Sequence, residues 1–379
     1  MAVAARPRIL IADDQPDVLE ALRLLLSQYD YALQLVTTPG TVLDQLRGKT
    51  WDLLLMDLNY SRDTTSGREG LELLRAARAI DPTLPVVAMT AWGNIELAVE
   101  AMRAGAQSFV QKPWDNSELV QVLQREVERG RGLREQSDRH QREEREGLMI
   151  QRALLPAALP TTETFAVAGA WQPAAGFGGD CYDTFTFGPT TLGLTIADVA
   201  GKGLPAALLM SSLQAAVRAF ALESTPPHAV CASVNRLLCG QMIAGRFATL
   251  CFVRLERARG TLSYVNAGHN PPLLARATGD VERLSIGGTV LGVFPDAHYR
   301  TGEVGLSSGD RLLLYTDGIT EAVNAQDEEF GEDRLAETLS AHRHLPAQSL
   351  FETVLSKVTT FTGARGFQDD ATLLVVAVK

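Results

Sequence analysis

Two stretches decide the fold of the larger half of the chain: "GFGGDCYDTF", residues 176–185, and "TIADVAGKG", residues 195–203. Each contains an aspartate, Asp180 or Asp198, that stands beside glycines at the edge of an apolar run typical of a β-strand. The pattern recurs in "LLLYTDG" (312–318) and "FQDDATLLVV" (367–376). Because glycine lets a backbone approach an ion or a phosphate closely, these acids are candidates for one shared site.

The candidate site contains carboxylates and no cysteine or histidine pair, which favours a hard cation such as Mg²⁺ or Mn²⁺. Two such ions would activate a water and clamp a phosphate oxygen, so the site would hydrolyse a phosphomonoester without a protein nucleophile. The alternative is that these are turn aspartates, since Asp-Gly is a common hairpin signal. The ordered series of acidic motifs favours the metal site.

The region from 161 to 379 contains many strand-like runs and two helical stretches, 204–222 and 332–361. Many strands with few helices predict an α+β sandwich with helices packed outside the sheets. The first 125 residues differ, because short apolar runs at 8–13, 52–57, 85–90 and 108–113, with a less regular one at 32–37, alternate with amphipathic helices. This alternation predicts an α/β doubly wound domain with a parallel sheet covered on both faces.

Polar residues follow the predicted parallel strands at their carboxyl ends, where such sheets bind ligands. They are Asp13, Asp14, Asp57, Thr90 and Lys112. Three carboxylates at one sheet edge repel one another unless a cation neutralises them, and Mg²⁺ suits such oxygen ligands. A lysine and a hydroxyl nearby would bind an oxyanion, so the set predicts phosphoryl chemistry on Asp57.

Between the two regions, "LREQSDRHQREEREG" (133–147) has almost no apolar residue. A helix that is polar on all sides cannot lie in a core, so it is either a solvated linker or a signalling helix that pairs with a second copy. The predicted organisation is therefore multi-domain, with a domain over 6–125, a helical linker over 126–160 and a domain over 161–379.

The composition excludes several classes of function. The net charge of −10 argues against nucleic acid or an anionic membrane as the main partner. The four cysteines form no C-x-x-C pair, which argues against zinc and is typical of reduced thiols. No run has signal-peptide character or the ~20 apolar residues of a membrane span, so a cytoplasmic protein is expected.

The N-terminal set resembles the receiver domain of bacterial two-component response regulators, over roughly residues 6–125. The resemblance implies a sensor histidine kinase as partner and a bound Mg²⁺. One departure is the loop "NYSRDTTSGREG" (59–70), which is longer than usual and lacks the family's proline. The implied roles are metal binding by Asp13, Asp14, Asp57 and the Asn59 carbonyl, phosphorylation of Asp57, switching by Thr90 and Phe109, and phosphate binding by Lys112.

The motifs GGD-x-YD, ADVAGKG, NAGHNPP, YTDG-x-TEA and DDATLL resemble the protein phosphatase 2C family, in its SpoIIE- and RsbU-like branch, over about residues 148–379. The resemblance implies two Mn²⁺ or Mg²⁺ ions. The implied catalytic and metal-binding residues are Asp180, Asp198, Asp317 and Asp369, with the Val199 carbonyl as a further ligand and Asp370 as an alternative to its neighbour.

Two other residues invite a chemical role. His269 could be a general acid, but we expect it to order a loop through its ring hydrogen bonds. Cys181 is expected to pack, since nothing in the sequence around it lowers the pKa of its thiol.

Together the resemblances imply a response regulator whose output is hydrolysis of phosphoserine or phosphothreonine on a protein, controlled by phosphorylation of Asp57. The implied substrate is an anti-sigma-factor antagonist of the STAS type, and the linker helix is expected to form a homodimer. Two alternatives are a catalytically weak phosphatase-fold module that acts by partner binding, and a DNA-binding regulator. The sequence leaves the kinase, the substrate and the sign of regulation open.

Overall fold

The computed structural model describes residues 6–60, 67–90, 95–174, 176–188, 190–242 and 245–379. Contacts divide the chain into two units, Met1–Arg142 and Glu143–Lys379. Each unit is described by itself. Residues 61–66 of the long loop predicted after Asp57 lie outside the described residues.

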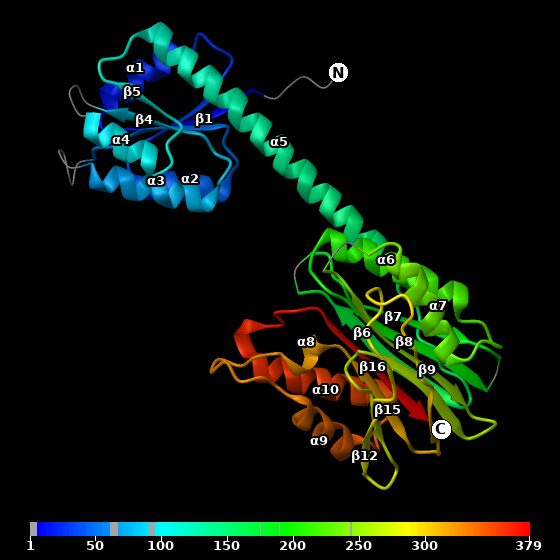
Figure 1. Cartoon of the computed structure of the whole chain (residues 1–379). Coiled ribbons are helices and arrows are strands. Elements are labelled where there is room, and N and C mark those ends of the chain that lie inside the picture. Colours follow the sequence, from blue (N-terminus) through cyan, green and yellow to red (C-terminus); the bar gives the residue numbers. More distant parts are fainter. Residues whose placement is uncertain (1–5, 61–66, 91–94, 175, 189, 243–244) are drawn as a thin grey trace. The chain divides into compact units, whose positions relative to one another are not determined.

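The N-terminal unit contains a five-stranded sheet in the order β2-β1-β3-β4-β5, and every pairing in it is parallel (Figure 1). Its central strands are buried along their whole length, which explains why they read as continuous apolar runs. The strands are β1 (Arg8–Ala12), β2 (Ala32–Val36), β3 (Leu53–Asp57), β4 (Val86–Thr90) and β5 (Ser108–Gln111).

Helices cover both faces of this sheet, as predicted. Side chains of α1 (Pro16–Leu26) and of the first turns of α5 (Asn116–Leu154) share one apolar cluster with the sheet. The other face packs against α2 (Pro39–Gly48), α3 (Arg68–Ile80) and α4 (Ile95–Arg103). The doubly wound fold is therefore confirmed, and it brings the carboxyl ends of β1, β3, β4 and β5 to one edge.

The C-terminal unit contains two sheets (Figure 1). One has the order β13-β10-β9-β8-β7, with β14 also paired to β10, and the other has the order β12-β11-β15-β16-β6. The strands are β6 (Phe165–Gln172), β7 (Cys181–Thr186), β8 (Thr191–Val199), β9 (Ala248–Glu256), β10 (Thr261–Ala267), β11 (Leu273–Ala275), β12 (Val281–Arg283), β13 (Gly287–Gly288), β14 (Gly302–Gly305), β15 (Arg311–Tyr315) and β16 (Ala371–Val378).

The sheets of this unit pack face to face, and helices flank them. One apolar cluster joins the inner faces of the two sheets. A second joins α6 (Leu204–Phe220) and α7 (Pro227–Cys239) to the first sheet. A third joins α9 (Glu332–His342) and α10 (Ala347–Thr362) to the second sheet. This confirms the β-sandwich with flanking helices, in which α8 (Asp317–Thr320) and a 3₁₀ turn (Gly363–Arg365) complete the second layer.

Most of the region predicted as a helical linker, 126–160, lies in one continuous helix, α5, which is 39 residues long and begins at Asn116. Its first part is tied to the N-terminal unit, because Arg134 donates to the Trp51 carbonyl at 2.7 Å and to Asp81 at 3.0 Å. Its last turns belong to the C-terminal unit, where Gln151 is buried. Most side chains between these parts are exposed, as the polar composition requires.

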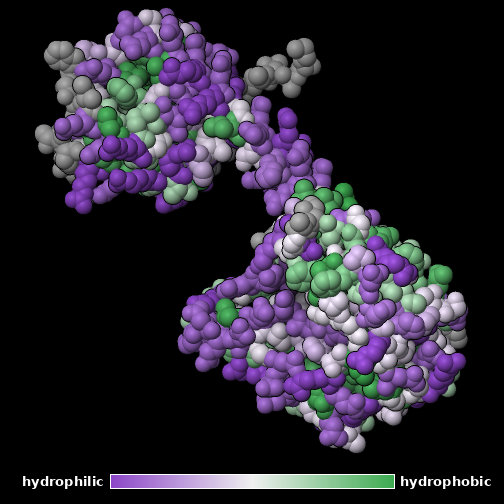
Figure 2. Space-filling model, in the orientation of Figure 1, coloured by the Kyte–Doolittle hydropathy of each residue, from purple (hydrophilic) through white to green (hydrophobic). Residues whose placement is uncertain are grey.

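Apolar side chains are also exposed on the C-terminal unit. Figure 2 shows hydrophobic colour gathering on the side of this unit that carries α6 and α7. Large exposed apolar residues there include Leu204 and Leu208 of α6, and Met149 and Ile150 near the end of α5. No helix in the described part of the chain is long and apolar enough to cross a membrane.

Candidate functional site

The four predicted aspartates of the C-terminal unit lie at the ends of strands from both sheets. Asp180 immediately precedes β7, and Asp198 is the second-last residue of β8. Asp317 begins α8 two residues after β15, and Asp369 lies two residues before β16. The sandwich therefore brings together acids that are up to 189 positions apart in the sequence (369 − 180).

Asp180 is the most deeply placed of them, with 1 % of its surface exposed. Its Oδ2 accepts hydrogen bonds from the hydroxyls of Thr316 and Thr372, each at 2.7 Å. Burial, followed by the charge of Asp198, raises the pKa of Asp180 well above its usual range. The two threonines thus fix the direction of a carboxylate whose charge needs a cation nearby.

The pKa of Asp198 is raised to about 7, first by burial and then by the charges of Asp317, Asp369 and Asp370. Burial and the charge of Asp369 also raise the pKa of Asp317. Burial and mutual repulsion thus disfavour the ionised forms of these carboxylates. A divalent cation would favour the ionised forms, so the group is a chemically suitable donor set for such an ion.

A cavity of about 340 Å³ opens over these acids. Asp198, Asp317 and Asp369 line it, while the buried Asp180 is not part of its wall. The remaining lining residues are Ala200, Gly201, Lys202, Phe247, Thr249, Gly268 and Asn270. The cavity is thus large enough for a phosphoryl group and opens onto carboxylates from both sheets.

The two adjacent aspartates before β16 face different surroundings. Both Asp370 oxygens accept backbone hydrogen bonds, Oδ1 from Ala174 at 3.1 Å and Oδ2 from Gly179 at 2.8 Å. A Cβ on Gly178 would lie 2.3 Å from Asp370 Oδ2, so this close approach requires glycine. Asp370 therefore secures the loop before Asp180, whereas Asp369 lines the cavity. This geometry favours Asp369 over Asp370 as the cavity-facing ligand.

Val199 is fully buried, and its backbone N–H donates to the Gly179 carbonyl at 3.3 Å. The contact joins the end of β8 to the loop that carries Asp180. It places the Val199 backbone next to the acidic residues, where its carbonyl was expected to bind metal. That role stays a prediction.

His269 holds backbone segments together beneath the cavity. Its Nδ1 lies 2.8 Å from the Thr249 hydroxyl, and its Nε2 lies 3.1 Å from the Tyr315 carbonyl. Burial lowers the pKa of His269 to about 4, so the ring is neutral at pH 7. The carbonyl requires Nε2–H as donor, which leaves Nδ1 to accept from the threonine. These bonds match the loop-ordering role expected for it.

Cys181 is buried at the start of β7, and burial followed by the charge of Asp180 raises the pKa of its thiol. All four cysteines are free. A thiol of this kind stays protonated at neutral pH and is not a nucleophile.

Two residues of the site were not predicted from the sequence. Lys202 contacts Asp369 at 2.8 Å and lines the cavity. Gln151, on the last turns of α5, donates to the Gly178 carbonyl at 2.6 Å and accepts from the Gly178 N–H at 3.3 Å. The only sequence signal for Lys202 is its place between two glycines of "AGKG"; Gln151 has none.

A second acidic group lies at the sheet edge of the N-terminal unit. Oxygens of Asp13, Asp14 and Asp57 all lie within 4.8 Å of one another, the one group of three or more potential ligands of this kind among the described residues. Lys112 donates to Asp13 at 2.6 Å and to Asp57 at 2.8 Å. Its single charge leaves the group with excess negative charge, which fits a divalent cation.

Burial raises the pKa of Asp13, and the hydrogen bond from Lys112 offsets only part of this rise. Burial lowers the pKa of Lys112, but its bonds to Asp13 and Asp57 outweigh burial and raise it overall. Burial therefore explains the raised pKa of the acid, which the ion pair alone would lower, whereas the two aspartate partners explain the raised pKa of the lysine.

Of the other predicted receiver residues, Thr90 and Asn59 have contacts that connect them to this group. Thr90 is buried at the end of β4, and its carbonyl accepts from the Lys112 N–H at 2.7 Å. Phe109 of β5 is 49 % exposed. The Asn59 N–H lies 3.4 Å from Asp57 Oδ1, which places its backbone at the group.

These folds and sites define a receiver domain followed by a phosphatase domain of the 2C type. Residues 188–379 match the family model described as Stage II sporulation protein E (SpoIIE), and residues 9–124 match that of the response regulator receiver domain. The chain therefore belongs to the SpoIIE family, and its N-terminal part is a receiver domain.

Among proteins similar to this chain, IcfG of Synechocystis sp. is 30 % identical over 257 residues, which cover 61 % of this chain and 40 % of IcfG. The phosphoserine phosphatase RsbU of Bacillus subtilis is 27 % identical over 231 residues, covering 61 % of this chain and 68 % of RsbU. The chain thus spans less than half of the first relative. The solved SiaA-PP2C domain of Pseudomonas aeruginosa matches with a TM-score of 0.57 and 25 % identity, covering 64 % of this chain and 98 % of that domain.

Proposed function

We propose that the protein is a response regulator whose output is metal-dependent hydrolysis of phosphoserine or phosphothreonine on another protein. The observation that carries the proposal is the convergence of Asp198, Asp317 and Asp369 on one cavity, beside the buried Asp180. RsbU and RsbP of Bacillus subtilis, both named phosphoserine phosphatases, are 27 % identical to this chain.

In this proposal, two Mn²⁺ or Mg²⁺ ions are held by Asp180, Asp198, Asp317 and Asp369, together with the Val199 carbonyl. When bound, such ions supply an activated water and neutralise charge on the phosphoryl group. The chain contributes orientation: Thr316 and Thr372 direct Asp180 through their hydroxyls. It also excludes competing chemistry, because the Cys181 thiol is buried and stays protonated, and both ring nitrogens of the buried His269 are engaged in hydrogen bonds.

For the receiver domain, we propose that a sensor histidine kinase supplies the phosphoryl group to Asp57. Asp13, Asp14, Asp57 and the Asn59 carbonyl would hold Mg²⁺. Lys112 already contacts Asp57 and would offset charge on the phosphoryl oxygens. Thr90 and the exposed Phe109 would change conformation with phosphorylation and alter the surface of the domain.

The names of RsbU and RsbP support a phosphoserine substrate, and the identity of the substrate protein is our proposal. We propose a phosphoserine or phosphothreonine on an anti-sigma-factor antagonist of the STAS type, by analogy with the regulated phosphatases that this chain resembles. We also propose a homodimer formed through α5. Two apolar side chains near its end, Met149 and Ile150, are exposed. They support self-association, because pairing with a second copy would remove them from water.

The test is hydrolysis of p-nitrophenyl phosphate and of phosphorylated antagonist proteins at saturating Mn²⁺. We expect Asp198→Asn to lose at least two orders of magnitude in rate, because it removes a ligand expected to be shared by both ions. Retention of more than about a tenth of the wild-type rate would contradict the metal assignment. A folded wild-type protein that binds a phosphorylated antagonist without hydrolysing it would support the alternative of a partner-binding module.

A further inference from the structure

Lys202 lies in the short loop between β8 and α6 and lines the same cavity as the acids. The glycines on either side, Gly201 and Gly203, have φ values of 111° and 76°, which other residues rarely adopt. A Cβ on Gly201 would also lie 2.6 Å from a guanidinium nitrogen of Arg246. Both positions beside Lys202 therefore have a backbone conformation that favours glycine, and the lysine side chain itself is mostly exposed.

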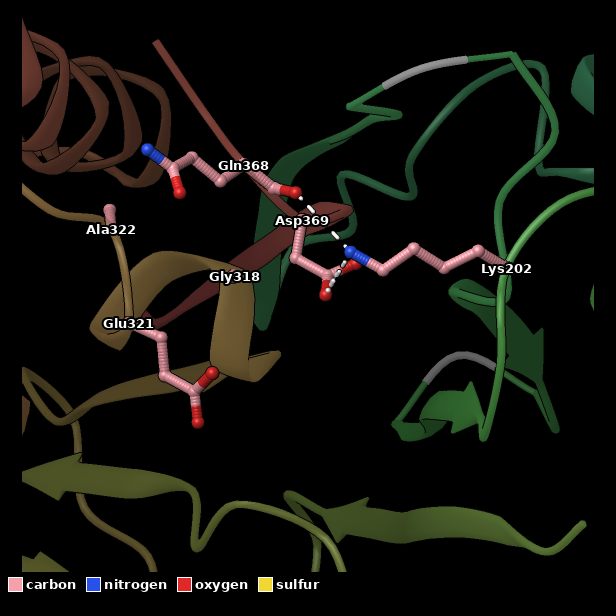
Figure 3. Close-up of a pocket in the computed structure, with 6 residues that line it drawn as sticks. All are labelled: Lys202, Gly318, Glu321, Ala322, Gln368 and Asp369. Carbon is pink, nitrogen blue, oxygen red and sulfur yellow. Dashed lines mark hydrogen bonds and ion pairs between the residues drawn. The ribbon is translucent and has the colours of Figure 1, made fainter. Parts of the chain in front are cut away.

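The ammonium of Lys202 reaches across to the segment before β16. Its Nζ lies 2.8 Å from Asp369 Oδ2 and 3.4 Å from the Gln368 carbonyl, as Figure 3 shows. The side chain of Lys202 is 70 % exposed, so it carries the ordinary positive charge of a lysine at neutral pH. A positive charge therefore sits on a carboxylate that we propose as a metal ligand.

The Lys202–Asp369 pair also separates two cavities. Both residues line the cavity of about 340 Å³ that contains Asp198 and Asp317. Both also line a neighbouring cavity of about 230 Å³, whose other walls are Gly318, Glu321, Ala322 and Gln368 (Figure 3). Among the described residues that line either cavity, Lys202 is the one lysine or arginine. A phosphate bound in either cavity would therefore lie near this cation.

We infer that Lys202 sets the balance between metal binding and phosphate binding at this site. A divalent cation that binds Asp369 must share this carboxylate with the ammonium or displace it, and either outcome weakens metal binding. In return, the same ammonium is available to a phosphoryl oxygen of the substrate. The inference rests on the proposed function only in taking the acids as a divalent-cation site.

Loss of the Lys202 charge should strengthen Mn²⁺ binding and weaken phosphate binding. Damage to the fold would weaken both, so the two explanations can be separated. Lys202→Met removes the charge and keeps most of the apolar stem. We expect it to tighten Mn²⁺ binding by about tenfold, the size of one partly screened charge interaction at a protein surface. We expect competitive inhibition by inorganic phosphate to weaken by about tenfold for the same reason. Both changes should diminish in high salt.

The experiment measures Mn²⁺ binding to the full chain by titration calorimetry, and phosphate inhibition of p-nitrophenyl phosphate hydrolysis. Lys357→Met, at an exposed position of α10, is the matched control for loss of one positive charge and should change neither value. Lys202→Arg should remain close to wild type in metal affinity. An Asp198→Asn variant identifies the heat that comes from this site rather than from the receiver acids.

Equal Mn²⁺ affinities for the Lys202→Met and Lys357→Met variants would overturn the inference, and so would weaker binding by Lys202→Met. Tighter Mn²⁺ binding with unchanged phosphate inhibition would overturn the phosphate role of the ammonium. If the Asp198→Asn variant binds as much Mn²⁺ as the wild type, the two-metal site itself is refuted. The two failures are therefore distinguishable.

Discussion

Asp57 is a buried carboxylate that we propose as the phosphoryl acceptor. Lys112 contacts its Oδ2 at 2.8 Å, and the Leu58 N–H contacts its Oδ1 at 2.7 Å. We expect Asp57→Asn to prevent labelling of the chain by acetyl phosphate, because an amide is not a carboxylate nucleophile. Phosphate-affinity electrophoresis measures the label, and Asp44→Asn, at an exposed site of α2, should label like wild type. A wild-type level of label on Asp57→Asn would place the acceptor elsewhere.

His269 gives a pH dependence of stability whose sign is set by burial. Its folded-state pKa of about 4 lies below the unfolded value near 6.5, so the unfolded chain binds the proton more readily. Its contribution is complete above about pH 6.5 and is lost as the pH falls toward 4, by at most about 3 kcal/mol. Urea unfolding of the full chain measures this. His269→Gln should lose that part of the pH dependence, and identical profiles would contradict the assignment.

The limits of sequence analysis are clearest at single residues. Asp198, Asp317 and Asp369 stand beside apolar runs, so their places at a sheet edge could be predicted. Lys202 contacts Asp369 across 167 positions (369 − 202), and Asp370 contacts the Gly179 backbone across 191. Neither contact leaves a periodic signal, since both depend on how two sheets pack.

At the scale of elements, strands with strong apolar runs were predicted within a residue or two, including β1, β8 and β16. The strand β7 was missed because "CYDTFT" is largely polar, and its Asp183 is buried through an ion pair with Arg218 rather than by apolar character. The helix α7 was also missed. The region 332–361 is two helices, α9 and α10, because Pro346 ends the connection between them.

The end of α5 is hydrogen-bonded to the loop that precedes Asp180. Gln151 is 4 % exposed, and its amide pairs with both backbone groups of Gly178. Gln151→Ala leaves those buried groups unpaired, which should cost about 1–3 kcal/mol in unfolding free energy. It should also loosen the loop that leads to Asp180 and weaken Mn²⁺ binding.

The matched control for this prediction is Gln136→Ala, which removes the same side chain from an exposed position of the same helix. Urea unfolding and Mn²⁺ titration of the full chain supply the two measurements. If the variants at 151 and 136 unfold at the same urea concentration, the Gln151–Gly178 pairing contributes no stability.

At the scale of the whole molecule, α5 is the covalent connection between a site that would accept phosphate and a site that would remove it. Its N-terminal half, up to Arg134, contacts the receiver, and its last turns contact the phosphatase loops, while the stretch between is mostly exposed. A rigid helix transmits rotation along such a stretch, whereas a flexible tether does not. The proposed dimer adds a reason for rigidity, because paired helices resist unwinding.

Insertions of one to four residues after Gln136 distinguish these cases. Each added residue turns a helix by ~100° and lengthens it by ~1.5 Å, so stimulation by a phosphoryl mimic such as beryllofluoride should depend on insertion length. Four residues, which add little more than one turn, should retain the most stimulation, and two should lose most of it. We expect activation rather than inhibition by the mimic, and the Asp57→Asn background should abolish the response at every length. Equal stimulation across all insertions would show that the polar stretch is a tether and that phosphorylation acts through some route other than helical rotation.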